Sequence, residues 1–297
     1  MTIPVGPERH PRDLAAACFV VLTEEFFDAD GRPVPFELPD KKDTQDDPFD
    51  QLIRDRLDAR LPSGVKVLSS GKKLVSPDLV VARPEETSLL INGGEEMDMR
   101  RIIAIEVKKV NADSAGNAAR ASGMDYNSTP PCSHVTIHSK TGRLLAVPAF
   151  YLFAIHSQVN DKYILQGLAL VSGAMLNQDV ELYTSITGVR QKSIQLGTFG
   201  DGLDRQRPML VFANPLGWSW LREQPTLLHE RDDLADEQDD LHRVRQVIRT
   251  GRDGTKHEFW AYRGTAGIVE EAAIDPFPTP ANRKTETSPR GKFMIEL

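Results

Sequence analysis

A stretch of strict alternation at residues 101–110, RIIAIEVKKV, places the strongest constraint on the fold. Large apolar side chains alternate there with small or polar ones, and several are β-branched, which predicts a strand with one buried face. Residues 144–157 and 162–173 are long apolar segments joined by a turn at Asn160-Asp161, and they predict two further strands. A chain with these three segments has to fold around a β-sheet.

Two helical patterns precede these strands. Residues 13–27 begin with Asp13, a helix-capping residue, and continue as an apolar body. Residues 48–61 carry apolar side chains at helical spacing and stop at the Pro and Gly of residues 62–64. A further helix is expected at residues 239–250, with apolar side chains on one side and arginines on another. The predicted fold class is therefore α/β, a mixed central β-sheet flanked by helices.

Charge and cysteine content exclude several classes of protein. The chain has 297 residues and a formal net charge of −7, yet basic side chains concentrate at residues 100–120 and 243–256. Two cysteines, Cys18 and Cys132, exclude a disulfide scaffold and fit a reducing compartment. Apolar runs are shorter than the ~18 residues that a membrane span needs, and the polar start does not resemble a secretory signal. We expect a cytoplasmic protein without a membrane partner.

Two short segments combine residues suited to metal-dependent hydrolysis. On a strand, Glu106 and Lys108 share one face, with backbones about 7 Å apart at ~3.3 Å per residue. Asp78 opens its own strand after Pro77, and pairing of the two strands would let Asp78 and Glu106 converge on one ion. Hard oxygen ligands suit Mg²⁺, and a nearby lysine can orient the attacking water. A half-exposed strand with solvated Glu106 and Lys108 is the alternative reading of the same pattern.

The sequence Pro77-Asp78, then 27 residues, then Glu106-Val107-Lys108 resembles the motif of the PD-(D/E)XK nucleases. The resemblance covers about residues 49–173, and the chain as a whole is most similar to type II restriction endonucleases. It implies a restriction-endonuclease-like core and Mg²⁺ as cofactor. It also implies metal ligands on the Asp78 and Glu106 side chains and the Val107 carbonyl, with Lys108 positioning water. Some members add a helix acid, for which the candidates are Asp50, Asp55 and Asp58.

The same resemblance implies a sequence-specific endonuclease acting on double-stranded DNA. A homodimer is expected, because a palindromic site presents the same half-site to each subunit. Residues 1–210 would form the core with its N-terminal helices, and residues 211–297 a C-terminal extension for DNA binding or dimerisation. Two alternatives remain open: a repair or recombination nuclease that recognises DNA structure, and a non-catalytic DNA-binding protein in which Asp78 and Glu106 are only surface charges.

Candidate DNA contacts lie on a loop and on basic segments. The loop at residues 124–132, MDYNSTPPC, carries donors and acceptors suited to base edges or phosphates, although an ordinary turn has the same composition. The arginine face of the expected helix at residues 239–250 could dock on DNA or simply be solvated. A zinc site built from Cys132, His134 and His138 is disfavoured, because a fourth ligand is missing. We expect DNA contacts from Lys109, Asn127, Ser128, Thr129, Arg190, Lys192, Arg245 and Arg249.

Overall fold

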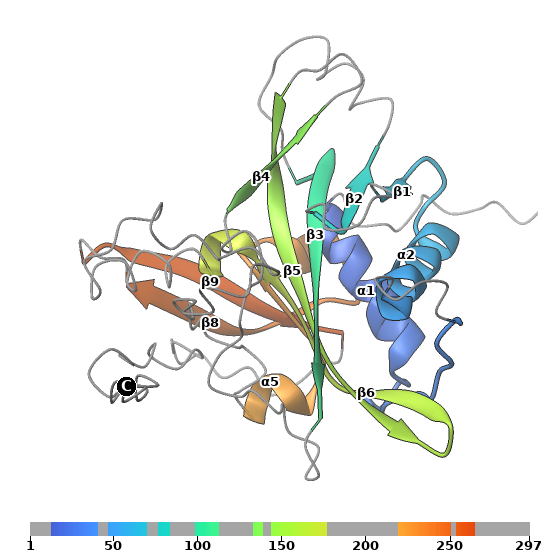
Figure 1. Cartoon of the computed structure of the whole chain (residues 1–297). Helices are drawn as coiled ribbons and strands as arrows, with labels where there is room; N and C mark the ends of the chain where they lie inside the picture. Colours follow the sequence, from blue (N-terminus) through green and yellow to red (C-terminus); the bar gives the residue numbers. More distant parts are fainter. Residues whose placement is uncertain are drawn as a thin grey trace, which may run out of the picture.

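A computed structural model describes residues 13–40, 47–69, 77–83, 99–112, 133–138, 144–176, 219–250 and 254–264. It confirms a mixed α/β fold with a nine-stranded central sheet flanked by helices (Figure 1). The helices are α1 (Leu14–Phe26), α2 (Pro48–Arg60), α5 (Ser219–Glu223) and α6 (Leu234–Glu237). The strands are β1 (Lys66–Leu68), β2 (Leu79–Ala82), β3 (Ile102–Asn111), β4 (His134–His138), β5 (Leu144–Val159), β6 (Lys162–Ser172), β7 (Thr226–His229), β8 (His242–Thr250) and β9 (Lys256–Arg263).

The strands lie side by side in the order β1-β2-β3-β5-β6-β7-β9-β8, and β4 pairs with β5 outside this path. Two neighbouring pairs, β3 with β5 and β6 with β7, are parallel, whereas the others are antiparallel. No described helix is long and apolar enough to cross a lipid bilayer.

The two N-terminal helices form where their capping residues predict. The Asp13 side chain accepts hydrogen bonds from the backbone N–H groups of Ala15 and Ala16, which begins α1. The Asp47 side chain does the same for Phe49 and begins α2, whose first residue is Pro48. Both helices are confirmed to within one residue of the predicted limits.

The long hairpin is also confirmed. β5 and β6 pair antiparallel and are joined at Asn160 and Asp161, whose φ angles are +48° and +65°. Asn and Asp tolerate this left-handed conformation better than most residues, and it gives a two-residue hairpin turn the twist that its strands need.

The prediction of a helix at residues 239–250 is wrong, because these residues contain the strand β8. β8 pairs antiparallel with β9, and a bulge lies between Arg243 and Arg245. The extra residue, Val244, disturbs the period of two, so that Val244 and Val247 both reach the same hydrophobic cluster although they are three residues apart. A spacing of three reads as helical in the sequence, which explains the error.

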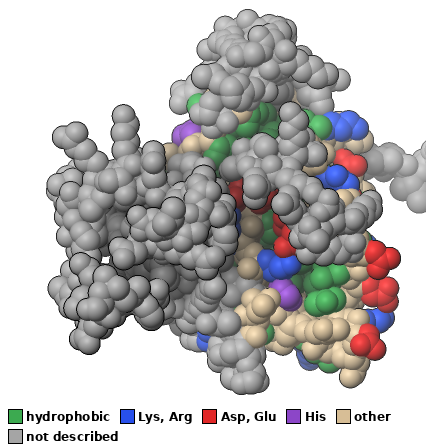
Figure 2. Space-filling view, in the orientation of Figure 1, with side chains coloured by type: hydrophobic (Ala, Val, Ile, Leu, Met, Phe, Trp, Pro, Cys, Tyr) green, Lys and Arg blue, Asp and Glu red, His purple; other side chains and the backbone are tan. Residues whose placement is uncertain are grey.

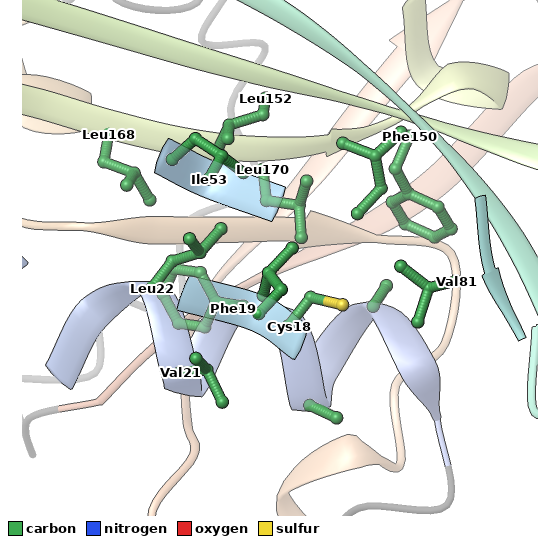
Figure 3. Close-up of a cluster of buried hydrophobic side chains, with 14 of the residues drawn as sticks. Cys18, Phe19, Val21, Leu22, Ile53, Val81, Phe150, Leu152, Leu168 and Leu170 are labelled. Atoms are coloured by element: carbon green, nitrogen blue, oxygen red, sulfur yellow. The ribbon is translucent and has the colours of Figure 1, made fainter. Parts of the chain in front are cut away.

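The two faces of the sheet bury different side chains. One face packs against α1 and α2, and Figure 3 shows Phe19 and Leu22 of α1 and Ile53 of α2 close to Leu152 and Leu170 of the sheet. The other face carries a second cluster that includes Tyr151, Phe153, Val171, Val247 and Ala261. Each fully buried side chain of this size contributes about 1.5–3 kcal/mol, so burial of both faces fixes which way every strand residue points.

The described part of the C-terminal extension belongs to the same sheet as the core. β7 pairs with β6, β9 with β7 and β8 with β9, so the extension adds its strands to the sheet edge that β6 offers. The expected boundary near residue 210 lies outside the described residues. The loop at residues 124–132 also lies outside them, as do Arg190 and Lys192.

A buried polar contact joins the start of α1 to the extension. Asp13 and His229 are both fully buried, and His229 Nε2 lies 3.3 Å from Asp13 Oδ2 without forming a hydrogen bond. His229 Nδ1 accepts from the Arg231 backbone N–H, which places the proton of a neutral ring on Nε2, toward Asp13. Burial would raise the pKa of Asp13, but the adjacent His229 ring, the backbone N–H of Ala16 and the charge of Arg231 hold it below its ordinary value.

We expect Asp13→Ala to lower the free energy of unfolding by about 2–4 kcal/mol, because it removes a helix cap and leaves buried donors unpaired. The difference should shrink as pH falls below 4, since the lowered pKa of Asp13 stabilises the fold only while the carboxylate stays ionised. Denaturant unfolding at several pH values measures both effects.

Asp28→Ala is the matched control. Asp28 also accepts two backbone hydrogen bonds, from Asp30 and Arg32, but in an exposed turn. Equal losses of stability in the two variants would show that burial of the Asp13 contact contributes nothing.

Candidate functional site

The pairing of β2 with β3 brings Asp78 to Glu106. The register runs from Ala82 opposite Ile102 to Leu79 opposite Ile105, so the residue before β2, Asp78, stands level with Glu106. Asp78 Oδ2 accepts a hydrogen bond of 2.7 Å from the backbone N–H of Val107. β3 extends beyond β2 at this point, and the Asp78 carboxylate takes the place of a strand partner for that N–H.

Glu106 and Lys108 lie on the same face of β3 and contact each other. Lys108 Nζ donates to Glu106 Oε1 over 2.8 Å, and the two side chains are 19% and 14% exposed. The structure therefore brings Asp78, Glu106 and Lys108 together where β2 begins, beside the middle of β3. The alternative of two separately solvated side chains does not describe this arrangement, because both charges are largely shielded from water.

The opposite face of β3 contributes a second ion pair through α2. Lys109 Nζ lies 2.7 Å from Asp47, the residue that caps α2, so the same carboxylate begins the helix and holds the lysine. The sequence did not single out Asp47, although an Asp directly before a Pro is a recognisable helix start. Lys109 was predicted to contact DNA, and this pair holds it beside the site.

Asp50 is the helix acid that faces the cluster. It lies in the first turn of α2 and interacts electrostatically with Asp78, Asp47 and both lysines. Asp55 is 54% exposed and accepts from Gln51 and Arg54 of its own helix, and Asp58 is exposed. The sequence left three candidates, and only the docking of α2 on the sheet separates them.

Two carboxyl groups in the cluster hold their protons more tightly than usual. Burial raises the pKa of Asp50 to about 8, and the nearby charges of Asp78 and Asp47 add to the effect. Burial also raises the pKa of Asp78 to about 6, with a contribution from the charge of Glu106, while the Val107 N–H and Lys108 oppose it. Acidic groups thus outweigh the two lysines, and the cluster has an excess of negative charge.

His156 of β5 lies close to these charges and was not identified from the sequence. Its ring lies against Phe49 of α2 and meets Tyr163 edge-on, with centroid distances of 6.5 and 5.9 Å. Burial lowers the pKa of His156, and the positive charge of Lys109 lowers it further. In an apolar strand segment a single histidine gives no sign of what it faces, so only the strand order could reveal its position.

Acidic and basic side chains and a histidine gather in one part of the space-filling view (Figure 2). Among the described residues, no three His, Cys, Asp or Glu side chains form a group that could hold a metal ion as they stand. Glu106 is turned to Lys108, and Asp78 to the Val107 N–H. The donors nevertheless fit a hard cation, because all are carboxylate oxygens and a divalent ion would neutralise their excess charge.

The two arginines of β8 that were predicted to contact DNA are held by other parts of the protein. Arg249 is only 4% exposed and donates to the Met175 carbonyl, so its guanidinium cannot reach a phosphate as it stands. Arg245 lies over the ring of Trp220, with its guanidinium carbon 4.5 Å from the ring centroid. The predicted helix face of arginines is therefore wrong, because the segment is the strand β8 and the guanidinium groups of Arg245 and Arg249 contact Trp220 and the Met175 carbonyl.

No family model, curated protein or solved structure matches the chain. Its function has to be inferred from the residues described above.

Replacing the carboxyl group of Asp50 with a neutral amide should stabilise the metal-free protein at high pH. The folded chain keeps the Asp50 proton up to about pH 8, whereas the unfolded chain loses it near the ordinary value of 3.8. The folded state thus binds the extra proton, and stability declines as pH rises from about 4 to about 8. At pH 8, we expect Asp50→Asn to raise the free energy of unfolding by roughly 1–3 kcal/mol.

Urea unfolding in a chelator between pH 5 and pH 9 measures this effect, with Asp55→Asn on the exposed side of the same helix as the control. A loss of stability in Asp50→Asn at pH 8 would show that the carboxyl group supports the fold rather than opposing it.

Proposed function

We propose that this chain is a Mg²⁺-dependent endonuclease that cuts double-stranded DNA at a specific sequence, like the type II restriction endonucleases whose motif it resembles. One observation carries the proposal. The β2–β3 register places Asp78, from one end of the motif, beside Glu106 and within 2.7 Å of the Val107 backbone N–H, with Lys108 2.8 Å from Glu106. Residues that are 28 positions apart in sequence thus lie together, which supports the proposal.

Asp78, Glu106 and the Val107 carbonyl would hold the metal ion, with Asp50 as a further carboxylate from α2. Their fit rests on the hard oxygen donors and on the excess of acidic charge that raises the pKa values of Asp50 and Asp78. A bound Mg²⁺ would lower the pKa of its water and stabilise charge on the phosphate.

The chain's own groups are positioned for the remaining work. The Val107 N–H holds the Asp78 carboxylate, and Glu106 holds the Lys108 ammonium, so both side chains lie at the proposed site before substrate binds. Lys108 would orient the attacking water and offset negative charge on the phosphate. Lys109, held by Asp47, would add a second positive charge from the helix side.

Sequence specificity and a two-fold homodimer are parts of the same proposal. Both are supported by the resemblance, and the dimer also by the symmetry of a palindromic site. A nuclease that recognises DNA structure would share the same catalytic group, so the products of cleavage distinguish the two activities. Discrete fragments from a long duplex indicate sequence recognition, and smears or cuts confined to junctions indicate the other.

We expect Asp78→Ala, Glu106→Ala and Lys108→Ala each to lower Mg²⁺-dependent cleavage of plasmid DNA at least about 100-fold, because each removes a group that acts on the phosphate or its water. Gel analysis of a time course with end sequencing of the fragments measures rate and cut position together. Asp55→Ala, on the exposed side of α2, should cut like the wild type. Equal residual cleavage in all four variants would mean that this group of residues is not the active site.

Metal binding should release a proton near neutral pH. At pH 7 the Asp50 carboxyl, with its pKa of about 8, is largely protonated, and a divalent ion among these oxygens would displace about one proton. Titration calorimetry with MgCl₂ in two buffers of different ionisation enthalpy measures that proton without any DNA. Asp50→Asn should abolish most of the release. An unchanged release of protons in Asp50→Asn would show that Asp50 does not bind the metal ion.

A further inference from the structure

The first turn of α2 is anchored to the rest of the fold by Phe49. This side chain is only 1% exposed, and the centroid of its ring lies 6.3 Å from that of Phe26 in α1 and 6.5 Å from that of His156 in β5. A buried aromatic side chain contributes strongly to packing, so it holds the backbone of the turn in place. Because β5 pairs with β3, the turn is also held relative to β3.

Asp47 stands at the start of this turn and makes two kinds of contact. Its Oδ1 accepts a hydrogen bond of 2.9 Å from the backbone N–H of Phe49, which caps α2. The ammonium of Lys109 on β3 lies 2.7 Å from each of the two carboxylate oxygens of Asp47. The Lys109 and Asp47 side chains are 26% and 36% exposed, so this ion pair is partly shielded from water.

The contact with Asp47 gives the Lys109 side chain a defined position. A lysine side chain has several rotatable bonds, and fixing its rotamers has a large entropic cost. Among the described residues, Asp47 is the one hydrogen-bonding partner of the Lys109 ammonium. The folded protein therefore meets this cost before any substrate binds, and the ammonium does not have to be ordered during the reaction.

Lys109 stands at a part of β3 that lies beside the proposed active site. β2 pairs with β3 only as far as Ile105, whereas β5 follows β3 to Asn111. Beyond Ile105, one edge of β3 thus has no strand partner within the described ranges. Asp50 interacts electrostatically with both Lys108 and Lys109, so the two ammonium groups lie near the same carboxyl group.

The two lysines belong to opposite faces of the strand, because they are neighbours in sequence. Each is held by a different carboxylate, Lys108 by Glu106 and Lys109 by Asp47. A phosphate bound between them would meet a positive charge from each face of β3.

We propose that Asp47 is a positioning residue of the proposed nuclease, which holds the Lys109 ammonium where it stabilises the negative charge of the phosphate to be cut. The proposal rests on the proposed nuclease function and adds a residue that lies outside the Asp78, Glu106 and Lys108 motif. Asp47 acts through Lys109. Its two contacts are separable, because a helix cap needs only an oxygen acceptor, whereas the hold on Lys109 depends on negative charge.

Asp47→Asn separates the two contacts. Asparagine caps a helix about as well as aspartate does, so the urea midpoint should stay close to that of the wild type, but the ion pair with Lys109 is lost. Asp47→Ser, whose hydroxyl also caps a helix, is a second variant of the same kind. Asp58→Asn is the matched control, because it removes the same charge from an exposed position of the same helix.

The measurement is the single-turnover rate of plasmid cleavage with the protein and Mg²⁺ at saturating concentrations, so that altered binding of DNA or metal does not affect it. We expect Lys109→Gln to lower this rate about tenfold, Asp47→Asn and Asp47→Ser about fivefold, and Asp58→Asn less than about twofold. The double variant Asp47→Asn/Lys109→Gln should cut as fast as Lys109→Gln, because Asp47 has no further effect once its lysine is gone. Two independent effects would instead multiply to about 50-fold.

The outcomes separate this proposal from the nuclease function. Losses that multiply, in a protein that cuts DNA, would overturn the role of Asp47 and leave the nuclease function standing. Cleavage by Asp47→Asn as fast as that of the wild type, or faster, would do the same. A wild-type protein that cuts no DNA would overturn the nuclease function and the role of Asp47 with it. A loss of folded protein would slow the double variant as well as Asp47→Asn, so unfolding cannot imitate the expected result.

Discussion

The antiparallel pairing of β2 with β3 is the constraint on which the site depends. It sets Asp78 level with Glu106, and the hydrogen bond from the Val107 N–H to Asp78 fixes the carboxylate there. A shift of the register by one residue would turn every side chain of β2 to the other face, so Leu79 and Val81 would leave the hydrophobic cluster that packs on α1 and α2. The hydrophobic face that packs on α1 and α2 thus also holds the charged residues in place.

These charged residues lower the stability of the metal-free fold. Among the described residues, Asp47, Asp50, Asp78 and Glu106 lie near two lysines, and the pKa values of Asp50 and Asp78 are raised to about 8 and about 6. A structural ion-pair network balances its charges, as Arg56 and Arg60 of α2 do with Glu24 and Glu25 of α1. An unbalanced and half-buried group of carboxylates is instead typical of functional sites, where neighbouring charges perturb pKa values.

The local pattern of apolar and polar residues predicted the helices and strands. How these helices and strands pack against one another could not be read from the sequence. Caps and apolar spacing placed α1 and α2, and alternation placed β3, because these signals depend on neighbouring residues only. β8 was missed because a bulge at Val244 replaces alternation with a spacing of three. Asp78, Glu106 and Lys108 could be singled out because the motif has a characteristic spacing. The choice of Asp50 over Asp55 depends on which turn of α2 meets β3, and that contact is made between segments about 50 residues apart.

A net charge of −7 argues against DNA binding only if distant charges act on one another across the whole molecule. At physiological ionic strength, exposed charges more than about 8 Å apart are largely screened from one another. Basic residues elsewhere on the chain therefore cannot offset the repulsion between the acidic residues of the proposed active site and a phosphate group brought to them. In the proposed function, that repulsion has to be relieved locally, by Lys108, Lys109 and a divalent cation.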